Sequence, residues 1–278
     1  MKSRVFFSGS AACFGAILLV IAGLSVRGDA RQKMKPEELV EKHLASIGTA
    51  EARAAARNRT VKGAAIVVFR PGPENRTTGN GVFVSEGKSV RLGLLFSALN
   101  YPGEDLAYDG NKFATGYVRP GVRSQLSEFV IAHDQLLKEG LMGGTLTTAW
   151  ALLDVPGRQP RLEYNGLKKR SGKEYHELRY MARRGGGDIR VLMYFDPQTF
   201  RHVQTEYRFV RMGQVEIRYT LTEEFADFDV ADSLTLPRGY KLKFTVEETA
   251  VNLMIDWSVA FDQIQHNQQL DPKTFILQ

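Results

Sequence analysis

The chain has 278 residues, of which 43% are apolar and 24% charged, and it contains a single cysteine. This composition is typical of an ordinary folded protein with one large core, and it excludes a disordered chain, a disulfide-stapled miniprotein and a collagen-like rod. The formal net charge is +6, and the first thirty residues contribute +2 of it through Lys2, Arg4 and Arg27 against Asp29.

Residues 1–30 have the layout of a secretory signal peptide. A basic start with Lys2 and Arg4 precedes an uncharged apolar stretch over 11–24, and small residues follow at 28–30. The alternative is an uncleaved N-terminal membrane anchor, because residues 5–26 are apolar or small apart from their polar serines. Cys13 precedes most of the apolar stretch, whereas a lipid-modified cysteine follows it. We therefore expect export to the periplasm and a mature chain without cysteine, whose stability rests on core burial.

The next elements are a helix and a series of hairpins. Leu39, Val40, Leu44 and Ile47 follow helical spacing over 36–47, with Pro36 at the start and Gly48 at the end. The alanine-rich residues 50–59 either extend this helix or lead into a strand. Strands are then predicted from their period of two and the turn residues between them, over 61–70, 77–86 and 89–96, with a hairpin over 106–118 around Asp109-Gly110.

A second helical block interrupts the strands. Apolar residues between Leu126 and Leu141 advance by threes and fours, Ser124 is the expected N-cap, and Gly140, Gly143 and Gly144 end the run. A short apolar piece follows over 145–154. Together these residues carry more apolar surface than the packing of one helix face on a sheet requires.

Strands are predicted again to the end of the chain, over 161–168, 174–181, 189–195, 200–210, 214–223, 240–248 and 252–265. About a dozen strands in meander order are incompatible with a parallel α/β sheet. The pattern predicts a mainly antiparallel β protein of the α+β class, with one large curved sheet and helices packed on one face. No change of composition marks a further boundary, so residues 31–278 are expected to form a single domain.

Motifs for catalysis or metal binding are absent from the sequence. It has no G-x-S-x-G, no phosphate-binding glycine loop, no H-E-x-x-H and no cysteine pair, and its five histidines have no metal-ligand spacing. His133 lies on the apolar side of its helix, where a core histidine is the expected role. Adjacent carboxylates such as Glu223-Glu224 face opposite ways on a strand. We expect no catalytic residues, no metal, no cofactor and no nucleic acid partner.

One stretch resembles a known family. The turn Asp-Pro-x-Thr-Phe occurs at 196 and again at 271, with the first Asp accepting backbone hydrogen bonds and Pro presetting the next residue. The segments 175–180, 185–188, 191–200 and 203–207 resemble the middle hairpins of the LolA-like superfamily of periplasmic lipoprotein carriers. The end of the chain, at 236–237, 240–246, 257–262 and 267–275, is similar to the ends of such chains.

This resemblance implies a half-open curved β-barrel with helices plugging its concave face around a hydrophobic cavity for acyl chains. An apolar cavity stays dry and accepts hydrocarbon, so binding needs no catalytic group. The candidates for lining the cavity or forming its lid alternate on strands or lie in the helical block; the alternative for each is an ordinary core side chain. They are Phe83, Leu92, Leu94, Leu137, Leu141, Met142, Leu146, Trp150, Val191 and Met193.

The function expected from this resemblance is a non-catalytic periplasmic carrier or binder of lipid or lipoprotein acyl chains. Its partners would be a lipid or an acylated lipoprotein and a membrane-bound donor or acceptor protein. Two alternatives remain open on the sequence: an envelope sensor or adaptor that uses the same fold to bind a protein partner, and an exported hydrolase.

Overall fold

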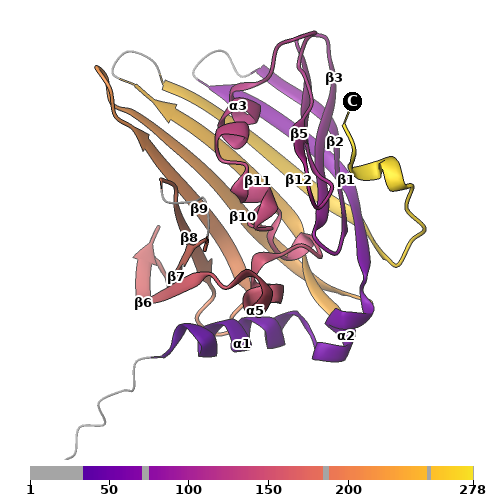
Figure 1. The fold of residues 1–278 in the computed structure, drawn as a ribbon, viewed down its shortest axis with the longest axis vertical. Helices are drawn as coiled ribbons and strands as arrows, with labels where there is room; N and C mark the ends of the chain where they lie inside the picture. The colour runs from indigo at the N-terminus through magenta and orange to yellow at the C-terminus, as the bar shows by residue number, and fades with distance from the viewer. Residues whose placement is uncertain (1–33, 71–74, 184–187, 249–251, 278) are drawn as a thin grey trace, which may run out of the picture. The chain divides into compact units, whose positions relative to one another are not determined.

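A computed structural model describes residues 34–70, 75–183, 188–248 and 252–277 (Figure 1). They belong to the unit Met34–Gln278. The predicted signal peptide and Cys13 lie outside the described residues, so the boundary at residue 30 stays a prediction.

Twelve strands form one antiparallel sheet, which is curved and does not close (Figure 1). The sheet order is β5-β4-β3-β2-β1-β12-β11-β10-β9-β8-β7-β6. The strands are β1 (Asn58–Arg70), β2 (Asn75–Glu86), β3 (Ser89–Ala98), β4 (Tyr101–Tyr108), β5 (Phe113–Thr115), β6 (Arg161–Arg170), β7 (Lys173–Met181), β8 (Arg190–Phe195), β9 (His202–Arg211), β10 (Ile217–Ala231), β11 (Leu234–Glu247) and β12 (Asn252–His266). This confirms the predicted fold class.

The strand order explains where the helices lie. Every pair of neighbours in the sheet is consecutive in the chain except β1 and β12, which join the two ends of the strand series. The sheet therefore has its free edges at β5 and β6, and the helical block over residues 116–160 is the connection between these edges. A connection from one edge to the other crosses a face of the sheet, and Figure 1 shows α3 in front of the long strands.

Two features of β1 allow strong curvature. Its register against β12 shifts between Lys62 and Gly63, and a bulge of this kind bends a strand and increases its twist. A Cβ at Gly63 would collide with the carbonyl of Ala260, so only glycine allows this close approach of β12.

The helices are short. They are α1 (Pro36–Ile47), α2 (Ala50–Ala55), α3 (Gln125–Ala132), α4 (Gln135–Lys138), α5 (Val155–Arg158) and the 3₁₀ turns η1 (Gly144–Leu146), η2 (Ala151–Asp154) and η3 (Pro272–Phe275). The predicted bounds of α1 are confirmed, and residues 50–59 divide between α2 and the start of β1. The long helix predicted from Leu126 to Leu141 is wrong, because α3 ends at Ala132 and only α4 follows before Gly140, where the backbone has positive φ.

The largest disagreement between prediction and structure is the hairpin of β10 and β11. The sequence predicted strands that stop at 223 and resume at 240, whereas the hairpin continues to Ala231 paired with Leu234. The acidic residues between Glu223 and Asp232 hid these strands, because aspartate is rare in strand interiors. The turn residues Asp232 and Ser233 both have positive φ, as a two-residue hairpin turn requires.

Most buried apolar residues form one cluster. It joins the concave side of the sheet to Leu39 and Val40 of α1, to α3 and α4, and to residues 141–152. A second small cluster of Ile47, Leu234 and Leu236 packs the end of α1 against β11. The helical block is thus part of the core and not a cover added to a finished sheet.

Candidate functional site

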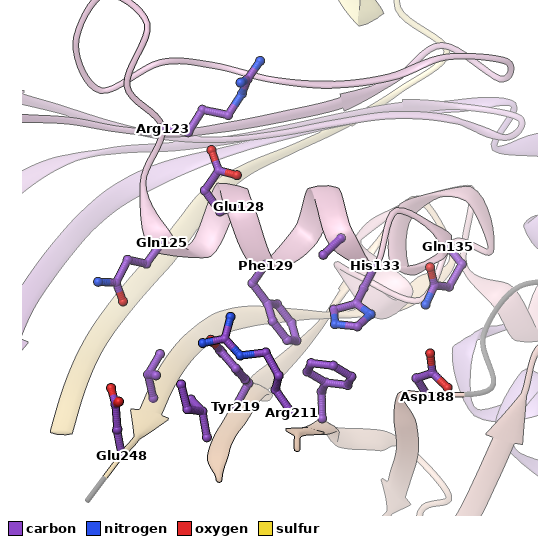
Figure 2. A pocket seen from close by; sticks show the side chains of 14 residues that line it. Arg123, Gln125, Glu128, Phe129, His133, Gln135, Asp188, Arg211, Tyr219 and Glu248 are labelled. Carbon is purple, nitrogen blue, oxygen red and sulfur yellow. The ribbon is translucent and has the colours of Figure 1, made fainter. Parts of the chain in front are cut away.

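A groove of about 790 Å³ lies between α3 and the strands β9, β10 and β11 (Figure 2). Its apolar walls come from Phe129 and Ala132 of α3 and from Phe209, Ile217, Tyr219 and Val246 of the strands. Charged and amide side chains occupy the rim, namely Arg123, Gln125, Glu128, Gln135, Asp188, Arg211 and Glu248. The groove is therefore apolar within and of mixed charge at its entrance.

Aromatic rings make up the walls of the groove. The rings of Phe129 and Tyr219 stack with centroids 5.7 Å apart, and Phe209 lies 5.9 Å from Tyr219. Phe209 and Tyr219 are directly opposite each other on β9 and β10, so their side chains share one face of the sheet. Both are only half-buried, so part of each side chain remains exposed, and both line the groove.

His133 joins α3 to this aromatic wall. Its ring centroid is 4.8 Å from that of Phe129 and 4.4 Å from that of Phe209. Burial lowers the pKa of His133, and the charge of Asp188 opposes that shift. The sequence predicts a core histidine, and the side chain of His133 is buried. Its ring also lines the groove.

A buried carboxyl group holds the first turn of α3. Ser124 is the N-cap, as predicted, and its hydroxyl oxygen accepts a hydrogen bond from the backbone N–H of Ser127. The hydroxyls of Ser124, Ser127 and Tyr101 all donate to Glu104 of β4, at 2.6, 3.0 and 2.7 Å. Burial raises the pKa of Glu104, and these three donors oppose that shift. The groove is therefore formed by a helix that is fixed at its N-terminus.

A second buried carboxyl group holds the segment that follows α4. Oε1 of Glu223, on β10, accepts hydrogen bonds from the backbone N–H of Gly143 at 2.7 Å and from the hydroxyl of Tyr240 at 2.8 Å. Its Oε2 lies 2.6 Å from the hydroxyl of Tyr207, which is also 2.8 Å from the carbonyl oxygen of Leu141. Gly143 is thus attached to Glu223 of β10, and Leu141 to Tyr207 of β9. Glu223 joins both contacts to Tyr240 of β11.

A proton on Oε2 of Glu223 would allow both contacts of the Tyr207 hydroxyl to be hydrogen bonds. A tyrosine hydroxyl has one proton, and the carbonyl of Leu141 can only accept it. If that proton points to Leu141, the short contact between Tyr207 and Glu223 needs a proton on Oε2 of Glu223. Burial raises the pKa of Glu223, although its three hydrogen-bond partners oppose the shift, and this agrees with a neutral carboxyl group.

Two buried histidines attach α1 to the core. Nε2 of His43 accepts from the indole N–H of Trp150 at 3.0 Å, so its proton is on Nδ1 and is donated to the carbonyl of Phe200. His202 lies 6.1 Å from His43, centroid to centroid, and its Nε2 contacts the carbonyl of Gln204 and the hydroxyl of Thr205. Burial lowers the pKa of His43 to about 4 and that of His202 well below its usual value.

The ten sequence-predicted ligand residues are brought together, but in the core. All of them belong to the main hydrophobic cluster and none is more than 3% exposed. None of them lines the groove beneath α3, and Trp150 lines a second pocket near α2. They are Phe83 on β2, Leu92 and Leu94 on β3, Leu137 on α4, Leu141, Met142, Leu146 and Trp150 in the segment after α4, and Val191 and Met193 on β8. A ligand-binding role for this set stays a prediction.

Sequence reasoning missed the residues that do line the groove. Phe129 and His133 were placed on the packing face of a helix, and Phe209 and Tyr219 were placed in strands without a role. A usable signal was present, because aromatic residues recur at 207, 209 and 219 on two consecutive strands. The register that puts Phe209 and Tyr219 opposite each other is visible only in the paired sheet.

In the part of the chain that the structure describes, no group of three or more His, Cys, Asp or Glu side chains is arranged to hold a metal ion. None of the described helices has both the length and the apolar character needed to cross a membrane.

Comparison with known proteins gives a likeness of fold. No family model and no curated protein matches the sequence. Among solved structures, a LolA superfamily protein from Nitrosomonas europaea is 11% identical, with 88% of this chain and 98% of that chain covered and a TM-score of 0.46. An outer membrane lipoprotein-sorting protein domain from Vibrio parahaemolyticus is 12% identical, with 87% and 97% covered and a TM-score of 0.49.

A DUF1329 family protein from Desulfovibrio piger is 9% identical, with 87% and 98% covered and a TM-score of 0.44. Two of these three structures carry the name of the family that the sequence resembles, and each is similar to this chain over most of both chains. At these identities and TM-scores the likeness assigns no ligand, partner or location to this chain.

Proposed function

We propose that the protein is a non-catalytic carrier or binder of lipid or lipoprotein acyl chains, which it holds in the groove beneath α3. The observation that carries this proposal is the combination of an apolar, aromatic interior and a polar rim in one groove of about 790 Å³. That volume lies within the range of small-molecule sites. A ligand with a hydrocarbon chain and a polar end matches both parts of the groove.

The energy needed for such binding comes from burial alone. Each methylene group removed from water contributes about 0.8 kcal/mol, so a chain of eight methylenes contributes roughly 6 kcal/mol before the cost of ordering it. Phe209 and Tyr219 are half-buried in the protein alone, and an acyl chain against their rings would bury the remaining apolar surface. No nucleophile or general base is needed for this role.

The rest of the proposal follows from the sequence. We propose that residues 1–30 direct export to the periplasm and are removed, and that residues 31–278 act as one carrier domain. The polar partners would be the donor and acceptor of the acylated ligand at the cell envelope. The groove rim, with Arg123, Arg211, Glu128, Asp188 and Glu248, is the surface where such partners would first meet the ligand.

The test is displacement of a fluorescent fatty acid from the purified chain. Phe209→Asp puts a charge in the groove wall, and we expect it to weaken probe binding at least tenfold. The matched control is Val210→Asp, because Val210 is the next residue of β9, is 45% exposed and faces the other side of the sheet. Its probe affinity should stay within twofold of wild type.

Two outcomes would contradict the proposal. The first is an absence of saturable probe binding together with an absence of co-purified lipid by mass spectrometry. The second is an equal loss of affinity in Phe209→Asp and Val210→Asp, which would indicate general damage to the sheet. Capture of a defined envelope protein by a lipid-free preparation, in a manner sensitive to Phe209→Asp, would favour the adaptor role instead.

A further inference from the structure

A second pocket, of about 460 Å³, lies where α2, the start of β1 and the segment after α4 meet. Four basic side chains line it, those of Arg53, Arg59, Lys88 and Arg158, and the one acidic side chain is Asp154. Lys88 and Asp154 form an ion pair at 3.7 Å. Among the described residues, no carboxylate lies within 4 Å of the three guanidinium groups, so the pocket has an excess of positive charge.

Arg59 is the most deeply buried of these cations, with only 4% of its surface exposed. Its Nε donates to Nε2 of His266 at 2.9 Å and its Nη1 donates to the carbonyl of Thr145, and both acceptors are uncharged. The nearest carboxylate in this chain of contacts is Asp232, on the far side of the His266 ring. Burial lowers the pKa of Arg59 to about 10. A buried cation without an adjacent counter-charge is costly, and a bound anion would remove that cost.

Three further polar groups of the pocket are buried without a partner in the described structure. They are the hydroxyls of Thr145 and Thr148 and Nε of Arg158. Thr145 is only 3% exposed. The two terminal nitrogens of Arg158 each donate to a carbonyl at 3.0 Å, those of Lys138 and Ala149, which fixes its guanidinium group in place. Buried polar groups are normally hydrogen-bonded, so three unused donors around one pocket point to a missing acceptor.

We propose that this pocket binds a phosphate group, held by the guanidinium groups of Arg53, Arg59 and Arg158 and by the hydroxyls of Thr145 and Thr148. Several donors that line one pocket match an acceptor with several oxygens. Arginine pairs with phosphate through paired N–H donors, and these charge-assisted hydrogen bonds are among the strongest in proteins. This site is separate from the groove beneath α3 and does not depend on the acyl-binding proposal.

An apolar groove beside the pocket distinguishes two sources of the phosphate group, a lipid headgroup and free inorganic phosphate. An apolar groove of about 660 Å³, lined by Val40, Leu44, Leu152 and Val155 among others, shares Ala50, Arg53 and Leu153 with the phosphate pocket. A phosphate group carried on an apolar chain would use both surfaces at once, with Arg53 at their junction. Free inorganic phosphate would use the phosphate pocket alone.

The test is calorimetric titration of the full chain with inorganic phosphate, with dihexanoyl-phosphatidylglycerol and with uncharged dihexanoylglycerol. Arg53→Gln should weaken binding of the phosphate-bearing probes about tenfold, since it removes a charged donor. Thr148→Val should weaken it severalfold while raising the thermal midpoint, because it replaces a buried unpaired hydroxyl with a methyl group. These opposite effects distinguish a binding role from a structural one.

The control is Arg57→Gln, which makes the same change of charge at an exposed arginine outside the pocket. Its affinity for both phosphate probes should stay within twofold of wild type. Binding of inorganic phosphate that is sensitive to Arg53→Gln and Thr148→Val supports a site for the phosphate group itself. Binding of the phospholipid at least tenfold tighter than phosphate, without binding of the diglyceride, supports a lipid headgroup as its source.

The proposal is overturned if neither probe shows saturable binding that responds to Arg53→Gln or Thr148→Val. It is also overturned if Arg57→Gln weakens binding as much as Arg53→Gln, since binding would then depend on net charge. Neither result bears on the fatty-acid probe, so failure here and failure of the acyl-binding proposal are distinguishable.

Discussion

The two halves of the helical segment between β5 and β6 have similar apolar sequences and different roles in the structure. The first half, α3, is fixed at its N-terminus by Glu104, and a groove separates it from β9, β10 and β11. The second half, residues 141–152, lies directly on the strands, where Glu223 bonds to Gly143, and Trp150 bonds to His43 of α1. Both halves contribute buried residues to the core and both are held by a buried carboxyl group of the sheet, but only α3 also leaves a groove beside the strands.

This comparison explains why the predicted ligand residues lie in the core. The excess of apolar residues in the helical block made Leu137, Leu141, Met142, Leu146 and Trp150 candidates for a cavity lining or a lid. In the structure, Gly140, Gly143 and Gly144 have positive φ. Their lack of a side chain also allows close contacts with the core: a Cβ at Gly144 would lie 2.7 Å from the ring of Phe225. These glycines therefore allow this segment to pack closely against the core.

The largest effect is expected at Glu223. Glu223→Ala leaves the hydroxyl of Tyr240 and the N–H of Gly143 buried without their partner, and it should lower the free energy of unfolding by about 3 kcal/mol or more. Glu223→Gln should cost only about 1 kcal/mol, because a glutamine NH₂ can donate to Tyr207 as a protonated carboxyl group does. Urea unfolding at pH 7 measures both. Equal losses for the two variants would contradict a neutral Glu223.

A pair of variants tests the contrast between core and groove directly. Leu146→Ala removes a fully buried side chain and should cost about 3 kcal/mol of stability, while fatty-acid affinity in the folded protein stays within twofold. Phe209→Ala removes a half-buried groove side chain and should cost about 1 kcal/mol, while affinity falls about fivefold. The comparison fails if Leu146→Ala reduces affinity more than Phe209→Ala does, since Leu146 would then belong to the ligand site.

A further effect, spread over a range of pH, is a dependence of stability on pH through His43. Its pKa is about 4 in the folded protein and near 6.5 when unfolded, so the unfolded chain binds more protons between these values. Its contribution is complete above pH 6.5 and is lost as the pH falls toward 4, by roughly 3 kcal/mol at most and less where the core relaxes. His202 acts in the same direction, whereas the raised pKa values of Glu104 and Glu223 favour the folded state as the pH falls.

The His43→Gln variant separates these contributions. Its stability should be below that of wild type at pH 7. The difference should shrink as the pH falls from 6.5 to 4, because the cost of protonating His43 lowers the stability of the wild-type protein alone in this range. Urea midpoints across this pH range provide the measurement. A difference that stays constant with pH would contradict a depressed pKa for His43.

The fold was largely predictable because its signals are local. Helix α1 followed from the spacing of Leu39, Val40, Leu44 and Ile47, and the strands followed from their period of two and their turns. The extension of β10 and β11 beyond Glu223 was not predictable from propensity, because acidic side chains on the exposed face of a strand resemble a loop in sequence. The bonds of Glu223 with Tyr207, Tyr240 and Gly143 depend on residues far apart in the chain.

The sequence by itself determined the antiparallel meander, the place of the helical block between two series of strands and the excess of apolar residues in that block, since each depends on local periodicity and composition. Only the tertiary structure decided that α3 covers a groove while residues 141–152 become core, and that Arg59, Arg158 and two threonines meet around a second pocket. The physical reason is that sheet register and buried polar contacts join residues 80 or more positions apart, and no local pattern specifies such contacts.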